Sequence, residues 1–149
     1  MSEVSESIAI NATLAEVWEY HFDPAGWPIW VDGFGSVASS EAYPLAGGKL
    51  RWRSSPAGRG EVAEEVVEHE LRRLHRIAFT DPQTQGELRT EFQIRGQGVV
   101  VTQTLTYGLS GGGVFGFVSD KLFIRSQQRR SIQRSLLRLK REVEERAGA

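Results

Sequence analysis

The chain of 149 residues contains no cysteine, which excludes thiol nucleophiles, disulfide frameworks and cysteine-ligated metals. It also lacks a basic-then-apolar leader behind Met1, and a cysteine-free composition suits a reducing compartment, so we expect a cytoplasmic protein. No apolar run approaches the ~18 residues that a membrane-spanning helix needs. We therefore expect no stable insertion into a membrane.

Basic residues are missing from positions 1–48, which carry seven acidic side chains, whereas all 18 Lys and Arg side chains fall in the rest of the chain. The net charge is −1. Because a chain that is acidic overall is a poor polyanion binder, we expect no nucleic acid partner. A chain of this length can bury a hydrophobic core without disulfides or structural metals, and we expect one domain over residues 1–149.

The first part of the chain predicts a strand followed by a helix. Polar and apolar residues alternate over 5–10, which is the period of a half-buried strand. Thr13 and Glu16 have the spacing of a capping box that starts a helix. Asp23-Pro24 ends this helix, because proline pushes the preceding residue out of helical geometry. The aromatic stretch that follows, up to residue 34, leaves room for one or two helical turns.

The remainder predicts an antiparallel meander and one long helix. Turn residues separate six segments with strand character, at 36–40, 49–54, 61–68, 74–80, 87–95 and 99–107. Apolar positions at three- and four-residue steps predict a helix from about 117 to 145, long enough to cover the apolar face of the sheet. The triple glycine at 111–113 is predicted to be a hinge that lets a ligand in.

Three segments carry a resemblance to a known family. They are residues 8–22 with the step Ala15-Glu16-Val17-Trp18, the run Trp27-Pro28-Ile29-Trp30 after Asp23-Pro24, and Gly48-Lys49-Leu50-Arg51-Trp52. Over residues 4–145 the chain resembles the polyketide cyclase/dehydrase and lipid-transport group of the START-like (SRPBCC) superfamily. The resemblance implies an α+β helix-grip fold, in which a seven-stranded curved antiparallel sheet wraps around a long C-terminal helix, with two short helices after the first strand. It also implies a deep apolar cavity for a lipid, polyketide or similar ligand.

Polar residues on the inward side of the sheet indicate a cavity rather than a solid core. In the favoured register of the last strand Gln103 and Tyr107 face inward, and Gln128 approaches from the helix. An unpaired buried polar group costs about 1–3 kcal/mol, so these side chains need protein partners, water or a ligand. The alternative is a register shifted by one, which turns Val100 and the threonines at 102, 104 and 106 inward instead.

Candidate acid–base residues lie on two neighbouring predicted strands. His75 alternates with Ile77 and Phe79, so it faces inward and, as a neutral imidazole, can bind a ligand carbonyl or accept a proton. One of Glu64 and Glu65 also points to the covered face. A Glu–His pair in a pocket can run the proton transfers of a cyclisation. The alternative is a core or rim histidine and a salt-bridged carboxylate.

Large aromatic side chains complete the predicted site. Trp30 and Trp52 are suited to stack on an aromatic or polycyclic ligand, although side chains of this size also fill cores. His21 and His69 have no partner at metal-ligand spacing, so we expect no metal, and we expect no cofactor. The predicted ligand-binding residues are Trp30, Trp52, His75, Phe92, Gln103, Tyr107, Ile124 and Gln128.

The last predicted helix carries an arginine stripe, defined here as the basic residues from Arg125 to Arg141. Such a stripe is usually a solvated helix face. The acidic segment 1–48 can pair with it within or between chains, which leaves a homodimer open. The alternative is a docking surface for acidic lipid headgroups, nucleic acid or a partner protein.

These observations support three hypotheses. The first is binding or transport of a small, mostly apolar ligand, such as a lipid, polyketide or polycyclic aromatic, in a cavity between the sheet and the last helix. The second is a metal-free cyclase or dehydratase that uses His75 with Glu64 or Glu65. The third is a protein- or membrane-interaction module that uses the arginine stripe.

Overall fold

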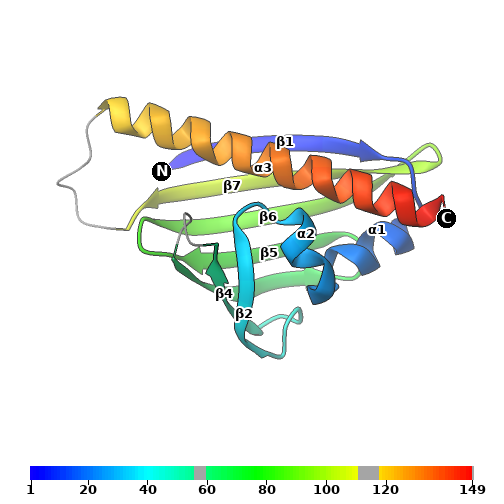
Figure 1. The fold of residues 1–149 in the computed structure, drawn as a ribbon, viewed down its shortest axis with the longest axis horizontal. Helices are drawn as coiled ribbons and strands as arrows, with labels where there is room; N and C mark the ends of the chain where they lie inside the picture. The colour runs from blue at the N-terminus through cyan, green and yellow to red at the C-terminus, as the bar shows by residue number, and fades with distance from the viewer. Residues whose placement is uncertain (56–59, 111–117, 149) are drawn as a thin grey trace.

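A computed structural model describes residues 1–55, 60–110 and 118–148 of the chain (Figure 1). Seven strands form one antiparallel sheet in the order β1-β7-β6-β5-β4-β3-β2. The strands are β1 (Ser2–Ile10), β2 (Phe34–Glu41), β3 (Lys49–Ser54), β4 (Glu61–Glu70), β5 (Leu74–Thr80), β6 (Thr84–Arg95) and β7 (Gly98–Leu109). The helical segments are α1 (Leu14–His21), a 3-10 turn (Pro24–Gly26), α2 (Trp27–Trp30) and α3 (Val118–Ala147).

The predicted start of the first helix is confirmed. The Thr13 hydroxyl accepts from the Glu16 backbone N–H at 3.2 Å, and the Glu16 carboxylate accepts from the Thr13 N–H at 3.0 Å. The Asp23 carboxylate then caps the 3-10 turn by accepting from the Ala25 N–H at 3.0 Å. Local hydrogen bonds therefore fix the path from β1 through α1 to the two short aromatic turns.

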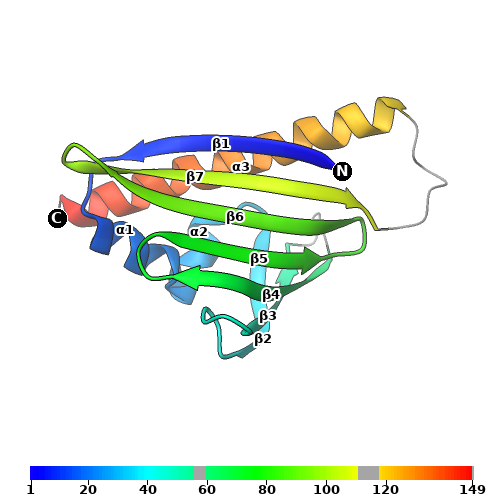
Figure 2. The same ribbon diagram turned by 180° about the vertical axis from the view of Figure 1, so that it is seen from behind.

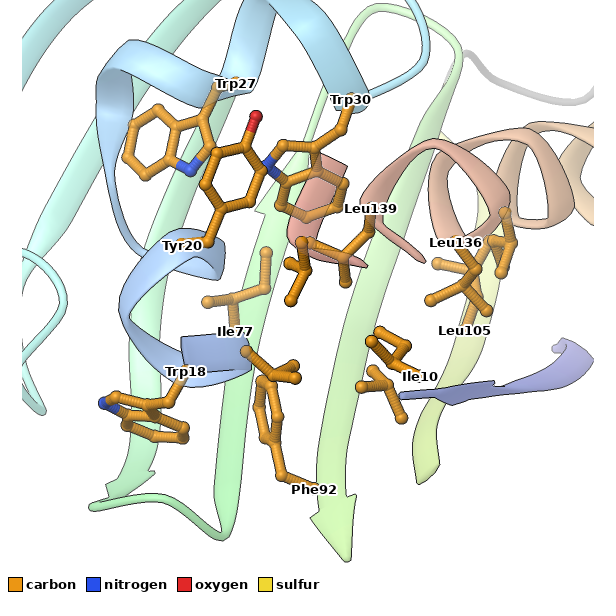
Figure 3. Packing of buried hydrophobic residues seen from close by; sticks show 14 of the residues in the cluster. Ile10, Trp18, Tyr20, Trp27, Trp30, Ile77, Phe92, Leu105, Leu136 and Leu139 are labelled. Carbon is orange, nitrogen blue, oxygen red and sulfur yellow. The ribbon is translucent and has the colours of Figure 1, made fainter. Parts of the chain in front are cut away.

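Helix α3 crosses one face of the sheet, whereas no helix lies on the other face within the described residues (Figures 1 and 2). Leu136, Leu139 and Val143 on α3 are buried against β1, α1 and α2. Side chains from all these layers meet in one core cluster (Figure 3). The arrangement is the α+β helix-grip fold that the sequence resemblance implied, with α3 running from 118 instead of 117 and ending at 147 instead of 145.

The register of β7 is the one favoured from the sequence. Val99, Val101, Gln103, Leu105 and Tyr107 are buried, and the residues between them are only half-buried. On the outer face, the threonines at 102 and 104 make hydrogen bonds of 2.7 and 3.0 Å with the serines at 7 and 5 of β1. The alternative register, which turned the threonines inward, is therefore wrong.

The predicted hinge at 111–113 lies outside the described residues. Among the described residues, no helix combines the length and the apolar character that crossing a bilayer requires.

Candidate functional site

A partly open cavity of about 140 Å³ lies between the inner face of the sheet and helix α3. The cavity is lined by residues from the three α-helices, from the loops on either side of β2, and from the strands β2 to β7. Much of the wall is aromatic and aliphatic, with Trp27, Trp30, Phe34, Leu50, Trp52 and Phe79 among its members. Polar side chains face the same space, including Tyr43, Glu64, His75, Thr90, Gln103 and Gln128. The cavity therefore combines apolar walls with a few convergent polar groups, as small-molecule sites do.

Five of the eight residues predicted to bind a ligand line this cavity. They are Trp30, Trp52, His75, Gln103 and Gln128. On β6 and β7 the lining consists of Leu88, Thr90, Gln103 and Leu105, which pair across the two strands. The cavity thus occupies only the middle of the sheet.

The other three predicted residues lie one step beyond the ends of the cavity. Phe92 is the next inward residue after Thr90 on β6, and its ring packs 4.9 Å from Trp18 and 5.2 Å from His21, measured between ring centroids. Tyr107 is the next inward residue after Leu105 on β7 and is buried. Ile124 precedes Gln128 by one helical turn and packs against the core cluster. The alternation that places a side chain inward does not tell how far along the strand the empty space extends.

Glu64 and Glu65 are separated by the alternation of β4. Glu64 lines the cavity, where its Oε2 accepts from Trp52 Nε1 at 2.7 Å, whereas Glu65 is exposed on the outer face. A bulge between Val66 and Glu68 then shifts the register of β4 against β5 by one residue. Because of this extra residue, His69 instead of Glu68 lies opposite His75.

His75 makes hydrogen bonds through both ring nitrogens. Its Nε2 lies 3.2 Å from the Tyr43 hydroxyl, and its Nδ1 lies 3.0 Å from His69 Nδ1. Burial, and secondarily the neighbouring His69, lowers the pKa of His75 to about 3. Burial also lowers the pKa of His69. Both imidazoles are therefore neutral near pH 7, and each presents one donor and one acceptor.

The cavity residues that were not in the predicted site include two with shifted pKa values, His21 and Tyr43. His21 ends α1, and burial together with His75 and His69 lowers its pKa to about 3. Tyr43 lies in the loop between β2 and β3, and burial, with the charge of Glu64, raises its pKa well above the usual value of 10.0. A turn residue such as Tyr43 has no periodicity that would indicate the direction of its side chain.

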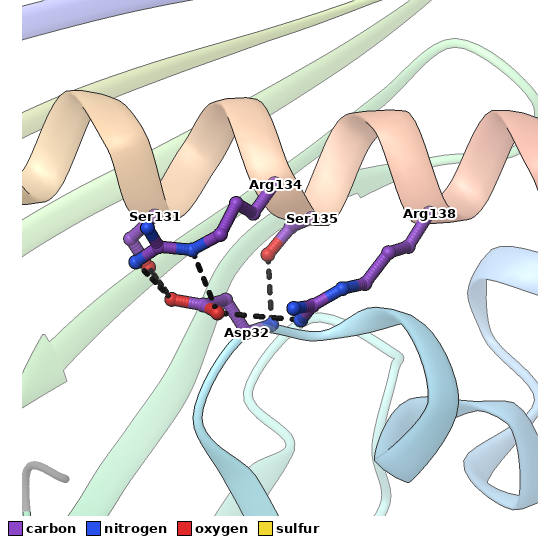
Figure 4. Close-up of polar contacts among 5 residues, drawn as sticks. All are labelled: Asp32, Ser131, Arg134, Ser135 and Arg138. Carbon is purple, nitrogen blue, oxygen red and sulfur yellow. Dashed lines mark hydrogen bonds and ion pairs between the residues drawn. The ribbon is translucent and has the colours of Figure 1, made fainter.

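A cluster of charged and polar groups, which we call the Asp32 clamp, ties the loop after α2 to α3 (Figure 4). The Asp32 carboxylate accepts from Arg134 at 3.1 Å, Arg138 at 3.2 Å and the Ser131 hydroxyl at 2.9 Å. The Asp32 backbone N–H donates to Ser135 Oγ at 2.8 Å. Burial raises the pKa of Asp32, but these hydrogen bonds and the guanidinium charges outweigh it and hold the pKa below its usual value. Asp32, Ser131 and Ser135 also line the cavity, so the clamp closes one of its sides.

The arginine stripe is largely engaged within the chain. Arg134 and Arg138 pair with Asp32, and Arg129 lies 2.8 Å from Glu6 of β1. The pairing between the acidic segment 1–48 and the last helix, which the sequence suggested, thus occurs inside one molecule. Arg129, Arg134 and Arg138 therefore hold the last helix against β1 and the loop after α2.

Comparison with known proteins identifies the family. The sequence profile of the family described as polyketide cyclase/dehydrase and lipid transport matches residues 1–144. The chain belongs to this family. No curated protein matches the sequence significantly.

Solved structures with the same fold include a protein of the steffimycin biosynthetic pathway and proteins from several bacteria. The di-domain ARO/CYC StfQ from the steffimycin biosynthetic pathway aligns with a TM-score of 0.78 at 14% identity, over 99% of this chain and 52% of StfQ. TTHA0849 from Thermus thermophilus aligns at 0.70 and 24% identity, over 95% and 97% of the two chains. The Aha1 dimer from Colwellia psychrerythraea aligns at 0.65 and 11% identity, over 97% of both. At these identities the likeness shows a shared fold.

In this member of the polyketide cyclase/dehydrase and lipid-transport family, the described part of the cavity wall presents no side chain of formal positive charge. Neither Lys nor Arg occurs among its described lining residues, and both histidines that line it have lowered pKa values. Glu64 and Asp32 are the acidic residues of the wall. The site is therefore suited to neutral molecules and offers hydrogen bonds instead of charge for their orientation.

Proposed function

We propose that this chain binds a small, mostly apolar molecule in the cavity between the sheet and α3. The observation that supports the proposal is the cavity itself, which is lined by aromatic side chains and by the polar residues His75, Gln103 and Gln128. Membership of a family described by lipid transport and polyketide cyclisation agrees with this use. Transfer of apolar ligand surface from water supplies affinity, at about 25 cal/mol per Å², and the polar groups set orientation.

The volume limits the size of the guest. Cavities of about 150 Å³ hold one benzene-sized ring, and the cavity here measures about 140 Å³. A single substituted ring therefore fits the space as it stands. A polycyclic ligand or a lipid chain exceeds this volume, so it would either project from the open side of the pocket or require that a wall move.

Native mass spectrometry of freshly purified protein tests the proposal. We expect a co-purified small molecule, or uptake of added single-ring aromatic compounds with a one-to-one stoichiometry. Replacing Trp52, which is buried and stacks on Phe34 at 5.1 Å between ring centroids, by alanine should abolish uptake because it removes one aromatic wall. Uptake that is the same in Trp52→Ala would contradict binding in this cavity.

Gln128→Leu should change ligand selectivity and leave the fold intact. The substitution keeps the approximate side-chain volume but removes a polar group from the cavity wall. We expect ligands that carry an oxygen to lose about threefold to tenfold in affinity relative to hydrocarbons of the same shape, because a net hydrogen bond contributes about 0.5–1.5 kcal/mol. Gln127→Leu, at an exposed neighbouring position of α3, is the matched control. If both variants discriminate equally between oxygen-containing ligands and hydrocarbons, Gln128 does not contribute to ligand binding.

A cyclase or dehydratase reaction is the second candidate, because His75 and Glu64 line the same cavity. The family is described by polyketide cyclisation and dehydration, and the structural neighbour StfQ is an ARO/CYC protein of the steffimycin biosynthetic pathway, which favours this candidate over other reactions. If the chain is such an enzyme, turnover of short poly-β-ketone compounds should depend on pH and be lost in His75→Gln. Turnover that survives in His75→Gln would exclude His75 as the acid–base residue.

A further inference from the structure

A chain of three hydrogen-bonding groups leads from the cavity into the sheet. It starts at the Tyr43 hydroxyl, which is 3.2 Å from His75 Nε2, and continues from His75 Nδ1 to His69 Nδ1 over 3.0 Å. Tyr43 and His75 line the cavity, whereas His69 does not line it and is only half-buried. The three residues come from the loop before β3, from β5 and from β4.

The contact between the two Nδ1 atoms restricts the protonation of the histidines. It needs one hydrogen and one lone pair, so one neutral imidazole carries its hydrogen on Nδ1 and the other does not. If His69 donates, His75 carries its hydrogen on Nε2 and donates to the Tyr43 oxygen. The Tyr43 O–H is then available to donate into the cavity.

The opposite arrangement reverses every bond of the chain. If His75 donates to His69, its Nε2 has a lone pair and accepts the Tyr43 O–H. The Tyr43 oxygen then faces the cavity as an acceptor. Both arrangements contain the same number of hydrogen bonds, so a guest can select either one without leaving a buried group unpaired.

We propose that Tyr43 is the polar contact for the bound molecule, and that the His69–His75 pair sets whether Tyr43 donates to it or accepts from it. This inference rests on the proposed binding function. The ligand class is a neutral, ring-sized compound whose oxygen is either a carbonyl or an enolic or phenolic hydroxyl. Both forms of a keto–enol pair meet a matching partner at the same atom.

Carboxylates do not belong to this class. Glu64 lies on the same wall, and the described lining residues include no Lys or Arg that could neutralise an anion. An anionic ligand would be placed near a like charge in an apolar space, which is unfavourable. Fatty acids and aromatic acids should therefore bind more weakly than the corresponding ketones and phenols.

Calorimetric titration with matched probes tests the proposal. Acetophenone is compared with cumene, p-cresol with p-xylene, and benzoate serves as the anionic probe. In the unchanged protein we expect both oxygen compounds to bind about threefold to tenfold more tightly than their hydrocarbon partners, and benzoate to bind weakest. In Tyr43→Phe the ratio of the affinity for each oxygen compound to that for its hydrocarbon partner should fall to about one, with the hydrocarbon affinities unchanged.

Tyr107→Phe is the matched control, because its buried hydroxyl has no hydrogen-bond partner within the described residues and lies outside the cavity lining. It should retain both preferences. Preferences that persist in Tyr43→Phe, or benzoate binding as tightly as acetophenone, would overturn the assignment of Tyr43.

A second measurement separates this inference from the proposed function. The ¹⁵N spectrum of the histidine rings in the ligand-free protein should show one Nδ1–H tautomer among His69 and His75, and saturating acetophenone should move the hydrogen of His75 to Nε2. If none of the probes binds, the proposed function fails. The ligand-free spectrum still shows whether His69 and His75 carry the complementary tautomers that the inference requires. Two Nε2–H tautomers at His69 and His75 would overturn the pairing that sets the direction at Tyr43.

Discussion

Lowering the pH from 7 to 5 is expected to remove about 4 kcal/mol from the free energy of unfolding, or about 2 kcal/mol for each of His21 and His75. Burial lowers the pKa of both side chains from the usual 6.5 to about 3, and neighbouring histidines add to the effect. Single domains are commonly stable by only about 5–15 kcal/mol. The expected loss is therefore a large share of the total.

The free energy of unfolding falls as the pH is lowered because the unfolded state binds more protons than the folded state. Between the folded-state pKa of about 3 and the unfolded value of 6.5, the unfolded chain holds protonated imidazoles and the folded chain holds neutral ones. Stability is therefore complete above about pH 6.5 and is lost as the pH falls toward 3. Asp32 and Glu144 have pKa values below their usual ones, so their contribution is lost only under more acidic conditions.

Urea unfolding near pH 5, 6 and 7 measures this dependence. His21→Gln should remove about half of it, since it deletes one of the two most strongly buried imidazoles. His69→Gln should have a smaller effect, because His69 is only half-buried. Equal free energies of unfolding near pH 5 and pH 7 in the unchanged protein would show that these histidines are not held neutral by the fold.

Asp32→Asn is expected to speed ligand exchange severalfold and to lower the free energy of unfolding by about 1–2 kcal/mol. The asparagine keeps the side-chain shape but loses the charge that attracts Arg134 and Arg138 (Figure 4). A hydrogen bond to a charged group contributes about 1.5–3 kcal/mol, and solvent exposure of the two arginines reduces this figure. Stopped-flow tryptophan fluorescence can follow exchange, because Trp30 and Trp52 line the cavity.

Arg130→Gln provides the matched control for the Asp32 clamp. Arg130 lies on the same helix and donates to Ser126 of that helix, away from Asp32. It should leave both the exchange rate and the stability nearly unchanged. Raised salt should speed exchange in the unchanged protein and have less effect in Asp32→Asn, since screening weakens the same charge contacts. Exchange rates that are equal in the unchanged protein and Asp32→Asn would mean that the clamp does not control access to the cavity.

The fold could be predicted from the sequence because each of its steps has a local signal. Thr13 and Glu16 marked the first helix, two-residue alternation marked the strands, and three- and four-residue steps marked α3. Strand alternation also gave the inward direction of Gln103 and His75. The two-residue period of a strand determines the side on which these side chains lie, and this period can be read from a single sequence.

The rest of the site depends on contacts between distant segments. Tyr43 reaches His75 from a loop, and Asp32 meets Arg134 about a hundred positions later in the chain. The length of the cavity, which excludes Phe92, is set by how closely α3 and the short helices approach the sheet. No local pattern encodes such distances, although the acidic segment 1–48 and the arginine stripe did indicate that the two ends of the chain attract one another.

The bulge in β4 makes the spacing of inward positions, and not composition alone, decisive for the histidine contact. Val66 pairs with Ile77 and His69 pairs with His75, and the extra residue of the bulge absorbs the odd step between them. Removing Val67 would therefore leave His69 opposite His75 on a regular strand, whereas a β4 of the present length without the bulge would place Glu68 opposite His75. Relatives that have both histidines should keep the contact when this spacing is even or when a bulge absorbs an odd spacing, and they should lose it when a regular strand has an odd spacing.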